Sequence, residues 1–360
     1  MARLALSLSP ARFAARALLA LGATFIAALA LAHQTPADAP ETRNDVVFTR
    51  YTPLSSNAEM ARRLLSPLTA ARIPAALARS GKVLAEQPID LARERFMVIV
   101  PARAPPGGYG LLVFVPPWES AAAPQGWAPV LDRAGVIFVS AARSGNVASP
   151  LSRREPLALL AWANITRRYK VDPARVYIAG FSGGSRVAMR LALGYPDVFV
   201  GALLDAGADR IGDRQVPLPP RDLFAKFQES TRLVFLAGAR DGEVLDKQEA
   251  SMASMREWCV QNLEERVMPL AGHEAADSAA LSRALEALAS PARPDPAKLA
   301  ACRVGVERRL AAAFQAVGSL IAGGKRDEAR RRLDDIDGRF GGLAAPRSLD
   351  LARRVDMLPD

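Results

Sequence analysis

The stretch VYIAGFSGG, residues 176–184, decides the fold prediction because an apolar run passes directly into the pattern Gly-x-Ser-x-Gly. A helical pattern begins near Ser185, so strand, tight turn and helix follow one another as in a nucleophile elbow. Gly180 and Gly184 suit such a turn, which leaves no room for side chains two residues before or after the serine. We predict that Ser182 is a catalytic nucleophile; the alternative is an ordinary serine in a glycine-rich turn.

Short apolar runs alternate with longer amphipathic runs around this stretch, from residue 96 to residue 289. Such alternation is typical of a parallel sheet covered by helices. The expected strands are 96–100, 110–115, 135–141, 176–180, 200–206, 232–237 and 265–270. The expected helices are 157–169, 185–195 and 246–263, with one more around 58–65 in a less regular region that also holds an edge strand or two. The predicted fold class is α/β, with a doubly wound and mostly parallel sheet.

Ser182 needs a base whose pKa lies near the working pH, and for this chemistry the base is histidine. The chain has only two histidines, and His33 falls at the expected start of the mature protein. The other, His273, follows the last expected strand, which is where a hydrolase sheet places its base. We therefore predict that His273 is the general base.

The third member of a triad is a carboxylate that orients the histidine, and in this fold it lies between serine and histidine in the chain. Asp241 fits best because it follows the expected strand 232–237, at the edge of a parallel sheet where ligands bind. The alternative is a turn aspartate beside a glycine. Asp205 and Asp209, after the preceding strand, are the reserve candidates.

Residues 172–184, DPARVYIAGFSGG, resemble the matching stretch of extracellular poly(3-hydroxybutyrate) depolymerases and of related feruloyl and acetylxylan esterases in the α/β-hydrolase superfamily. The likeness covers roughly residues 90–290. It implies a secreted esterase with Ser182, Asp241 and His273 as its triad.

An oxyanion hole needs one N–H from the residue after the nucleophile and a second from the loop after an early strand. Gly183 is the first donor, and Trp118 is the earliest possible second donor because Pro116 and Pro117 have no N–H. Trp118 can also form an apolar wall for the substrate or belong to the core. The resembling esterases carry His-Gly where this chain has Pro116-Pro117, and often a tryptophan where it has Glu274.

Two further segments are candidates for contact with the substrate. The loop 142–146 ends an expected strand at the same sheet edge, so Arg143 and Asn146 are candidate substrate-binding residues. Residues 207–230 are rich in charge and proline, and we expect a lid or specificity loop there.

Arg3, Arg12 and Arg16 precede a charge-free run at residues 17–32. This pattern predicts a signal peptide over residues 1–32 and a secreted or periplasmic protein. The run is shorter than the roughly 20 residues that cross a bilayer, so no stable membrane span is expected after cleavage. An uncleaved anchor is the alternative.

The chain carries a formal net charge of +10, which falls to +7 without the three arginines of residues 1–32. Acidic residues are interleaved with the basic ones, and no basic stripe or basic-aromatic module indicates a nucleic-acid partner. The charge therefore predicts a solvated, arginine-rich surface. Phosphate-loop, dinucleotide and metal-binding patterns are also missing from the sequence, so we expect no cofactor and no metal.

The predicted hydrolase domain, residues 43–289, is followed by a proline-rich linker at 290–297 and a helical extension at 298–360. Helical patterns at 298–322 and 326–339 predict a hairpin whose apolar faces cover the neighbouring domain or bind a separate partner.

The chain has two cysteines, Cys259 and Cys302, and an even pair in an exported protein is a candidate disulfide. This disulfide would join the extension to the catalytic body. A thiol nucleophile is the alternative, but it needs a histidine base, and His273 is already predicted to be the base of Ser182.

These observations predict a secreted serine hydrolase that cleaves small-molecule or polymeric carboxylic esters through an acyl-enzyme. A serine peptidase of the same fold is one alternative, because a triad serves amides and esters alike. A non-catalytic envelope protein that binds a partner through the helical hairpin is another. The sequence does not indicate the oligomeric state.

Overall fold

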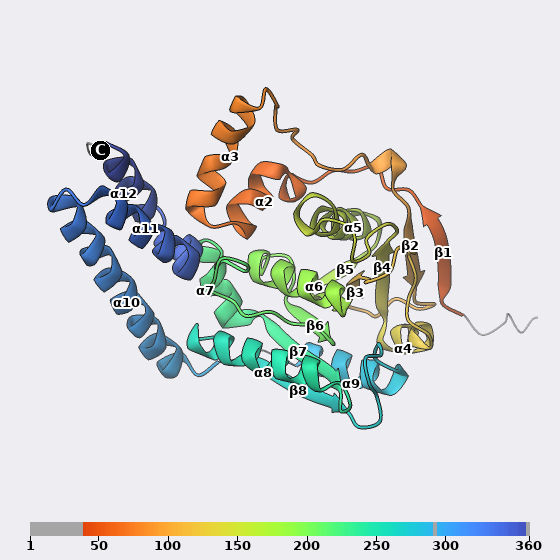
Figure 1. Ribbon diagram of the computed structural model, residues 1–360. Helices are drawn as coiled ribbons and strands as arrows, with labels where there is room; N and C mark the ends of the chain where they lie inside the picture. Colours follow the sequence, from red (N-terminus) through yellow and green to blue (C-terminus); the bar gives the residue numbers. More distant parts are fainter. Residues whose placement is uncertain (1–38, 291–293, 358–360) are drawn as a thin grey trace, which may run out of the picture. The chain divides into compact units, whose positions relative to one another are not determined.

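An eight-stranded sheet is the framework of the computed structural model, which describes residues 39–290 and 294–357 (Figure 1). The strand order is β1-β2-β4-β3-β5-β6-β7-β8. The strands are β1 Glu41–Val46, β2 Phe96–Val100, β3 Tyr109–Val115, β4 Val136–Ala141, β5 Val171–Phe181, β6 Gly201–Asp205, β7 Arg232–Gly238 and β8 Leu263–Met268. β2 runs antiparallel to β1 and β4, and all other neighbouring pairs are parallel. The predicted mostly parallel sheet is confirmed.

Strand β3 shows that the sheet is covered on both faces. Leu111 and Val113 belong to one buried cluster, whereas Leu112 and Phe114 belong to another, because successive side chains of a strand point to opposite faces. The helices that cover the first face are α5 (Glu155–Arg168), α6 (Gly183–Gly194) and α8 (Gly242–Glu257), and those on the second are α4 (Trp127–Ala134) and α9 (Ser278–Ala289) (Figure 1). Both faces are therefore apolar, as in a doubly wound sheet.

Strand β5 begins five residues earlier than the apolar run predicts. Tyr109 pairs with Val171 and Leu111 already pairs with Val176, so residues 172–175 bulge out of the ladder. Strand β8 ends at Met268, two residues earlier than predicted, because the chain turns there: the Ala271 N–H donates to the Met268 carbonyl at 3.3 Å.

Helix α8 spans Gly242–Glu257, whereas the sequence predicted 246–263. It starts earlier because the Asp241 side chain caps it, and it ends earlier because Cys259 has a φ of 67° and the Val260 N–H donates back to the Met255 carbonyl. Cys259 consequently follows the helix, and the prediction that it lies on the helix was wrong.

The predicted helix near residues 58–65 is present as α2 (Asn57–Leu64). Helices α3 (Pro67–Arg79), α4, α7 (Arg221–Ser230) and α9 were not predicted. Proline hides two of them from sequence patterns: Pro74 lies inside α3, and Pro220 directly precedes α7. Helix α7 therefore occupies the second half of the segment expected to be a loop.

The C-terminal extension contains the predicted hairpin, α10 (Pro296–Ala322) and α11 (Arg326–Phe340), followed by a third helix, α12 (Arg347–Asp356). Helix α10 begins within the predicted linker because Asp295 caps its first turn and Pro296 occupies the first helical position. Residues 291–293 of that linker lie outside the described residues.

The extension packs against the domain that contains the sheet, and its apolar residues join the larger buried cluster. The Asp337 carboxylate of α11 accepts hydrogen bonds from the Leu68 N–H and the Ser66 hydroxyl at the start of α3. The Gly342 N–H donates to the Leu218 carbonyl at 2.7 Å, in the segment before α7. The hairpin therefore covers the neighbouring domain, one of the two roles predicted for its apolar faces.

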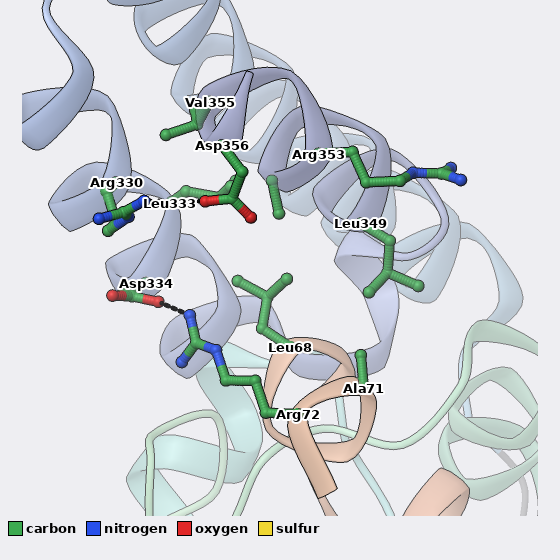
Figure 2. A pocket seen from close by; sticks show the side chains of 11 residues that line it. Leu68, Ala71, Arg72, Arg330, Leu333, Asp334, Leu349, Arg353, Val355 and Asp356 are labelled. Carbon is green, nitrogen blue, oxygen red and sulfur yellow. Dashed lines mark hydrogen bonds and ion pairs between the residues drawn. The ribbon is translucent and has the colours of Figure 1, made fainter. Parts of the chain in front are cut away.

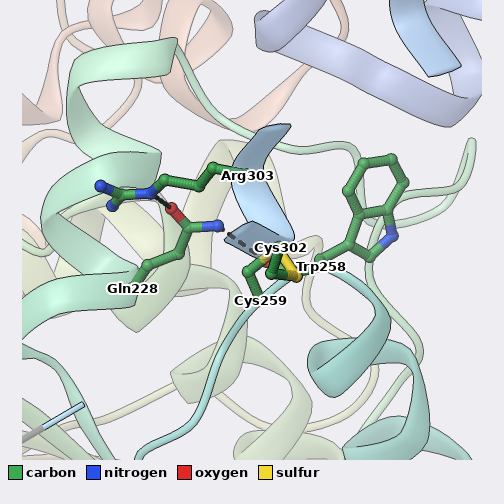
Figure 3. Close-up of a disulfide and its surroundings, with 5 residues drawn as sticks. All are labelled: Gln228, Trp258, Cys259, Cys302 and Arg303. Carbon is green, nitrogen blue, oxygen red and sulfur yellow. Dashed lines mark hydrogen bonds between the residues drawn. A yellow bond between two sulfur atoms is a disulfide. The ribbon is translucent and has the colours of Figure 1, made fainter. Parts of the chain in front are cut away.

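A disulfide joins Cys259, after α8, to Cys302 in α10 (Figure 3). Gln228 of α7 lies beside it, donates to the Trp258 carbonyl at 2.8 Å and accepts from Arg303 of α10 at 2.7 Å. Covalent and polar contacts thus hold α7, α8 and α10 together.

Helices α3, α11 and α12 enclose a groove of about 440 Å³ (Figure 2). Its walls include Leu68, Leu333 and Leu349, and the Arg72–Asp334 ion pair of 2.9 Å lies at its edge. The groove lies between α3 and the C-terminal extension and contains none of the predicted catalytic residues.

The predicted signal peptide, residues 1–32, and His33 lie outside the described residues. Within the part of the chain that the structure describes, none of the helices has the length and apolarity needed to cross a bilayer.

We expect removal of the disulfide by Cys259→Ser with Cys302→Ser to lower the free energy of unfolding by about 3–4 kcal/mol, because the cross-link closes a loop of 43 residues. Urea unfolding of the oxidised protein and the double variant measures this difference. Reduced wild-type protein should match the variant. Two free thiols in the native, unreduced protein would contradict the pairing.

Candidate active site

The turn between β5 and α6 places Ser182 in a conformation that few residues other than glycine adopt, with φ 53° and ψ −123°. The turn is tightly packed, because a Cβ on Gly184 would lie 1.9 Å from the Val115 carbonyl oxygen. The Ser182 N–H donates to the Asp205 carbonyl at 2.8 Å, which ties the turn to β6. Strand, strained turn and helix thus present the serine hydroxyl at the carboxyl edge of the sheet.

The structure brings Ser182, His273 and Asp241 together. The Ser182 Oγ lies 2.9 Å from His273 Nε2, and His273 Nδ1 lies 2.5 Å from Asp241 Oδ2. The imidazole packs beside the Phe181 ring, with 5.2 Å between ring centroids. These contacts give a nucleophile, a base and an orienting carboxylate in one hydrogen-bonded chain.

Asp241 is held by both of its carboxylate oxygens. Oδ2 binds His273, and Oδ1 accepts from the Val244 N–H at 3.4 Å as the cap of α8. The loop after β7 is also bonded to the loop after β8: the Arg240 N–H donates to the Ala271 carbonyl at 3.0 Å. The acid and the base therefore lie on two loops that position each other.

The two predicted oxyanion donors, Gly183 and Trp118, lie close to the loop that contains Asn146. Gly183 is the first residue of α6, and a Cβ on it would lie 2.2 Å from the Asn146 side-chain oxygen. The Asn146 N–H donates to the Pro117 carbonyl at 3.0 Å, beside Trp118. The Trp118 ring packs against Phe181, with centroids 6.3 Å apart. Asn146 thus lies against the nucleophile turn, and Trp118 remains the predicted second donor.

Arg143 and Asn146 differ in position, although both were predicted to contact substrate. Asn146 lines the same pocket as Ser182. Arg143 does not line that pocket; its guanidinium donates to the Arg93 carbonyl at 2.6 Å and to Glu94 at 3.0 Å.

The reserve acids do not contact His273. Asp205 is fully buried, and its Oδ2 accepts from the Ala276 N–H at 2.8 Å, in the loop that carries His273. Burial raises the pKa of Asp205 to about 8, although the Ala276 N–H opposes this shift. Asp209 lies 3.5 Å from Arg186, and burial raises its pKa as well.

A pocket of about 660 Å³ opens beside Ser182. Three arginines line it: Arg154, from the turn before α5, and Arg186 and Arg190 from α6. The sequence patterns did not predict these three arginines as site residues. Arg186 and Arg190 follow Ser182 by four and eight residues, a helical spacing that places them on one side of α6 and was a usable signal. No sequence spacing predicts Arg154, because it lies 28 residues before Ser182 on a separate segment that the fold brings to the pocket.

No protein-family model and no curated protein matches the chain. Solved structures do match, each over about half of the chain. A ferulic acid esterase is 18% identical, with a TM-score of 0.42 and coverage of 54% of this chain and 92% of that one. An S-formylglutathione hydrolase from Staphylococcus aureus is 14% identical, with a TM-score of 0.43 and coverage of 55% and 93%. Dipeptidyl peptidase 4 from Porphyromonas gingivalis is 13% identical, with a TM-score of 0.39 and coverage of 54% and 33%.

The chain has the α/β-hydrolase fold. The strand order, the antiparallel β2 and the strained turn at Ser182 carry this conclusion, and they confirm the fold that the resemblance implied. At the carboxyl edge of the sheet, Ser182, His273 and Asp241 have the hydrogen-bonded geometry of a Ser-His-Asp triad. Among the described residues, no group of three or more histidine, cysteine, aspartate or glutamate side chains could hold a metal ion.

We expect Asp205→Asn to stabilise the protein increasingly as the pH rises from about 4 to about 8. Folding keeps Asp205 protonated up to a pH of about 8, whereas the unfolded chain releases the proton near pH 4, so the wild type loses stability across this window. Asparagine can still accept from the Ala276 N–H and has no proton to lose. Urea unfolding of both proteins at pH 5 and pH 8 tests this. A stability difference that does not change with pH would contradict it.

Proposed function

We propose that this chain is a serine hydrolase that cleaves carboxylic esters through an acyl-enzyme. One observation carries the proposal: His273 lies within hydrogen-bond distance of both the Ser182 hydroxyl and the Asp241 carboxylate. The turn at Ser182 supports it, because strain of this kind is retained where function requires it.

In the proposed reaction, Ser182 Oγ attacks the ester carbonyl carbon while its proton passes to His273 Nε2. The carbonyl oxygen becomes an oxyanion near the Gly183 N–H, with Trp118 as the proposed second donor. His273 returns the proton to the leaving alcohol as the C–O bond breaks. A water molecule then attacks the acyl-enzyme with His273 again as base, which releases the acid and restores Ser182. Asp241 orients the imidazole and stabilises its charged form throughout.

We further propose that the protein acts after export, in the periplasm or outside the cell. The arginines and the charge-free run of residues 1–32 support this location. The disulfide between Cys259 and Cys302 is consistent with an oxidising compartment.

Ser182→Ala and His273→Ala should each lower kcat for 4-nitrophenyl esters by about 10⁴- to 10⁶-fold, because each change removes an essential member of a unit that acts together. The fold should survive, since neither side chain is part of the buried clusters. A fluorophosphonate probe should label wild type and not Ser182→Ala. If wild type is not labelled and no ester is cleaved, the protein is not a serine hydrolase. If peptide amides are cleaved and esters are not, it is a peptidase.

Asp241→Asn should reduce kcat roughly 10- to 100-fold less than Ser182→Ala, because it leaves nucleophile and base in place and impairs only their orientation. Asp205→Asn is the matched control, since Asp205 makes no contact with His273. Steady-state kinetics and circular dichroism of both variants test this. If Asp205→Asn is the more damaging change, the assignment of the acid to Asp241 is wrong.

A further inference from the structure

We infer that the ester cleaved by this protein carries an anionic group, which binds Arg186 in the arginine-lined pocket beside Ser182. The inference rests on the proposed function and deepens it by naming the substrate class. The pocket is lined by more positively charged side chains than negatively charged ones, and Arg186 is only loosely paired.

Arg154 is buried, with 4% of its surface exposed, yet it forms no ion pair with any carboxylate of the described residues. Its guanidinium donates to three backbone carbonyls: Ser144 at 2.9 Å, Pro116 at 2.9 Å and Gly183 at 3.3 Å. These bonds use three of its five N–H groups. Burial lowers the pKa of Arg154, which records the cost of holding this charge away from water.

Arg186 is the most accessible of the three arginines, with 43% of its side chain exposed. Its only ion-pair partner in the described structure is Asp209, and the closest approach, from Nε, is 3.5 Å. That distance is longer than a charge-assisted hydrogen bond. Arg186 therefore retains donors for a ligand.

Arg190 is already paired. It donates to the buried Glu155 at 2.7 Å and to the Gln215 carbonyl at 2.9 Å. Two carboxylates, Asp209 and Glu155, thus lie near three arginines around the pocket. Glu119 also acts on the charge of Arg154, but it does not line the pocket. The lining itself carries three positive groups and one negative group.

An anionic substrate group fits the charges that line this pocket better than a neutral substrate group does. A guanidinium offers a planar fork that matches the two oxygens of a carboxylate or an equivalent anion. A neutral acyl chain in the same pocket would cover the exposed guanidinium of Arg186 without replacing its hydrogen bonds to water, which costs free energy. Because Ser182 lies on the same pocket, the anion would be part of the ester itself.

Two pairs of esters test the inference, one for each side of the scissile bond. On the acid side, 4-nitrophenyl hydrogen glutarate is compared with its neutral methyl ester. On the alcohol side, 3-carboxyphenyl butyrate is compared with 3-methoxycarbonylphenyl butyrate. We expect wild type to prefer the charged member of at least one pair by about tenfold or more in kcat/KM, and added salt to reduce that preference.

Arg186→Gln should lower this ratio of charged to neutral kcat/KM at least fivefold. Arg308→Gln, which removes the same charge from the exposed face of α10, should leave the ratio as in wild type. Wild type that cleaves neutral esters with no preference for charged ones overturns the inference and leaves the proposed function intact. A preference that Arg186→Gln leaves unchanged also overturns it. If no ester is cleaved and the fluorophosphonate probe does not react, the proposed function fails and the inference with it.

Discussion

The strained turn at Ser182 sets the positions of the other groups in the site. Gly184 approaches the Val115 carbonyl so closely that β3, β5 and α6 can pack together only without a side chain there. The hydrogen bond from Ser182 to the Asp205 carbonyl holds the turn in its unfavourable conformation. Because α6 starts directly after Ser182, its first turns place Gly183 beside the nucleophile and Arg186 in the adjoining pocket.

Hydrogen bonds between the loops around this turn hold them in place, in addition to the strands that they follow. Arg154 joins three of them through the carbonyls of Pro116, Ser144 and Gly183. The loops after β7 and β8 are bonded together in the same way, which keeps Asp241 at hydrogen-bond distance from His273. Hydrogen bonds to backbone carbonyls thus hold Arg154 at the pocket, and others hold the acid and the base of the triad together.

The C-terminal extension also contacts the segment before α7, and this segment contains Asp209 and Gln215 of the pocket. Gly342 bonds to Leu218, and Arg221 donates to the Leu343 carbonyl at 2.8 Å. The disulfide fixes α10 to the end of α8, next to the buried Trp258. The extension therefore packs against one wall of the pocket beside Ser182 without supplying a residue to the triad.

Most of the sheet, the turn at Ser182 and the order of serine, acid and base were predictable from the sequence, because apolar periodicity and glycine spacing are local properties of the chain. It missed α3 and α7, where prolines obscure the helical pattern, and it placed Cys259 inside α8 because a left-handed residue has no reliable signal outside glycine. It also grouped Arg143 with Asn146, which the fold separates. The position of Arg154 in the same pocket as Ser182 and Arg186 is visible only in the folded chain, because Arg154 lies on a separate segment that packing brings to α6.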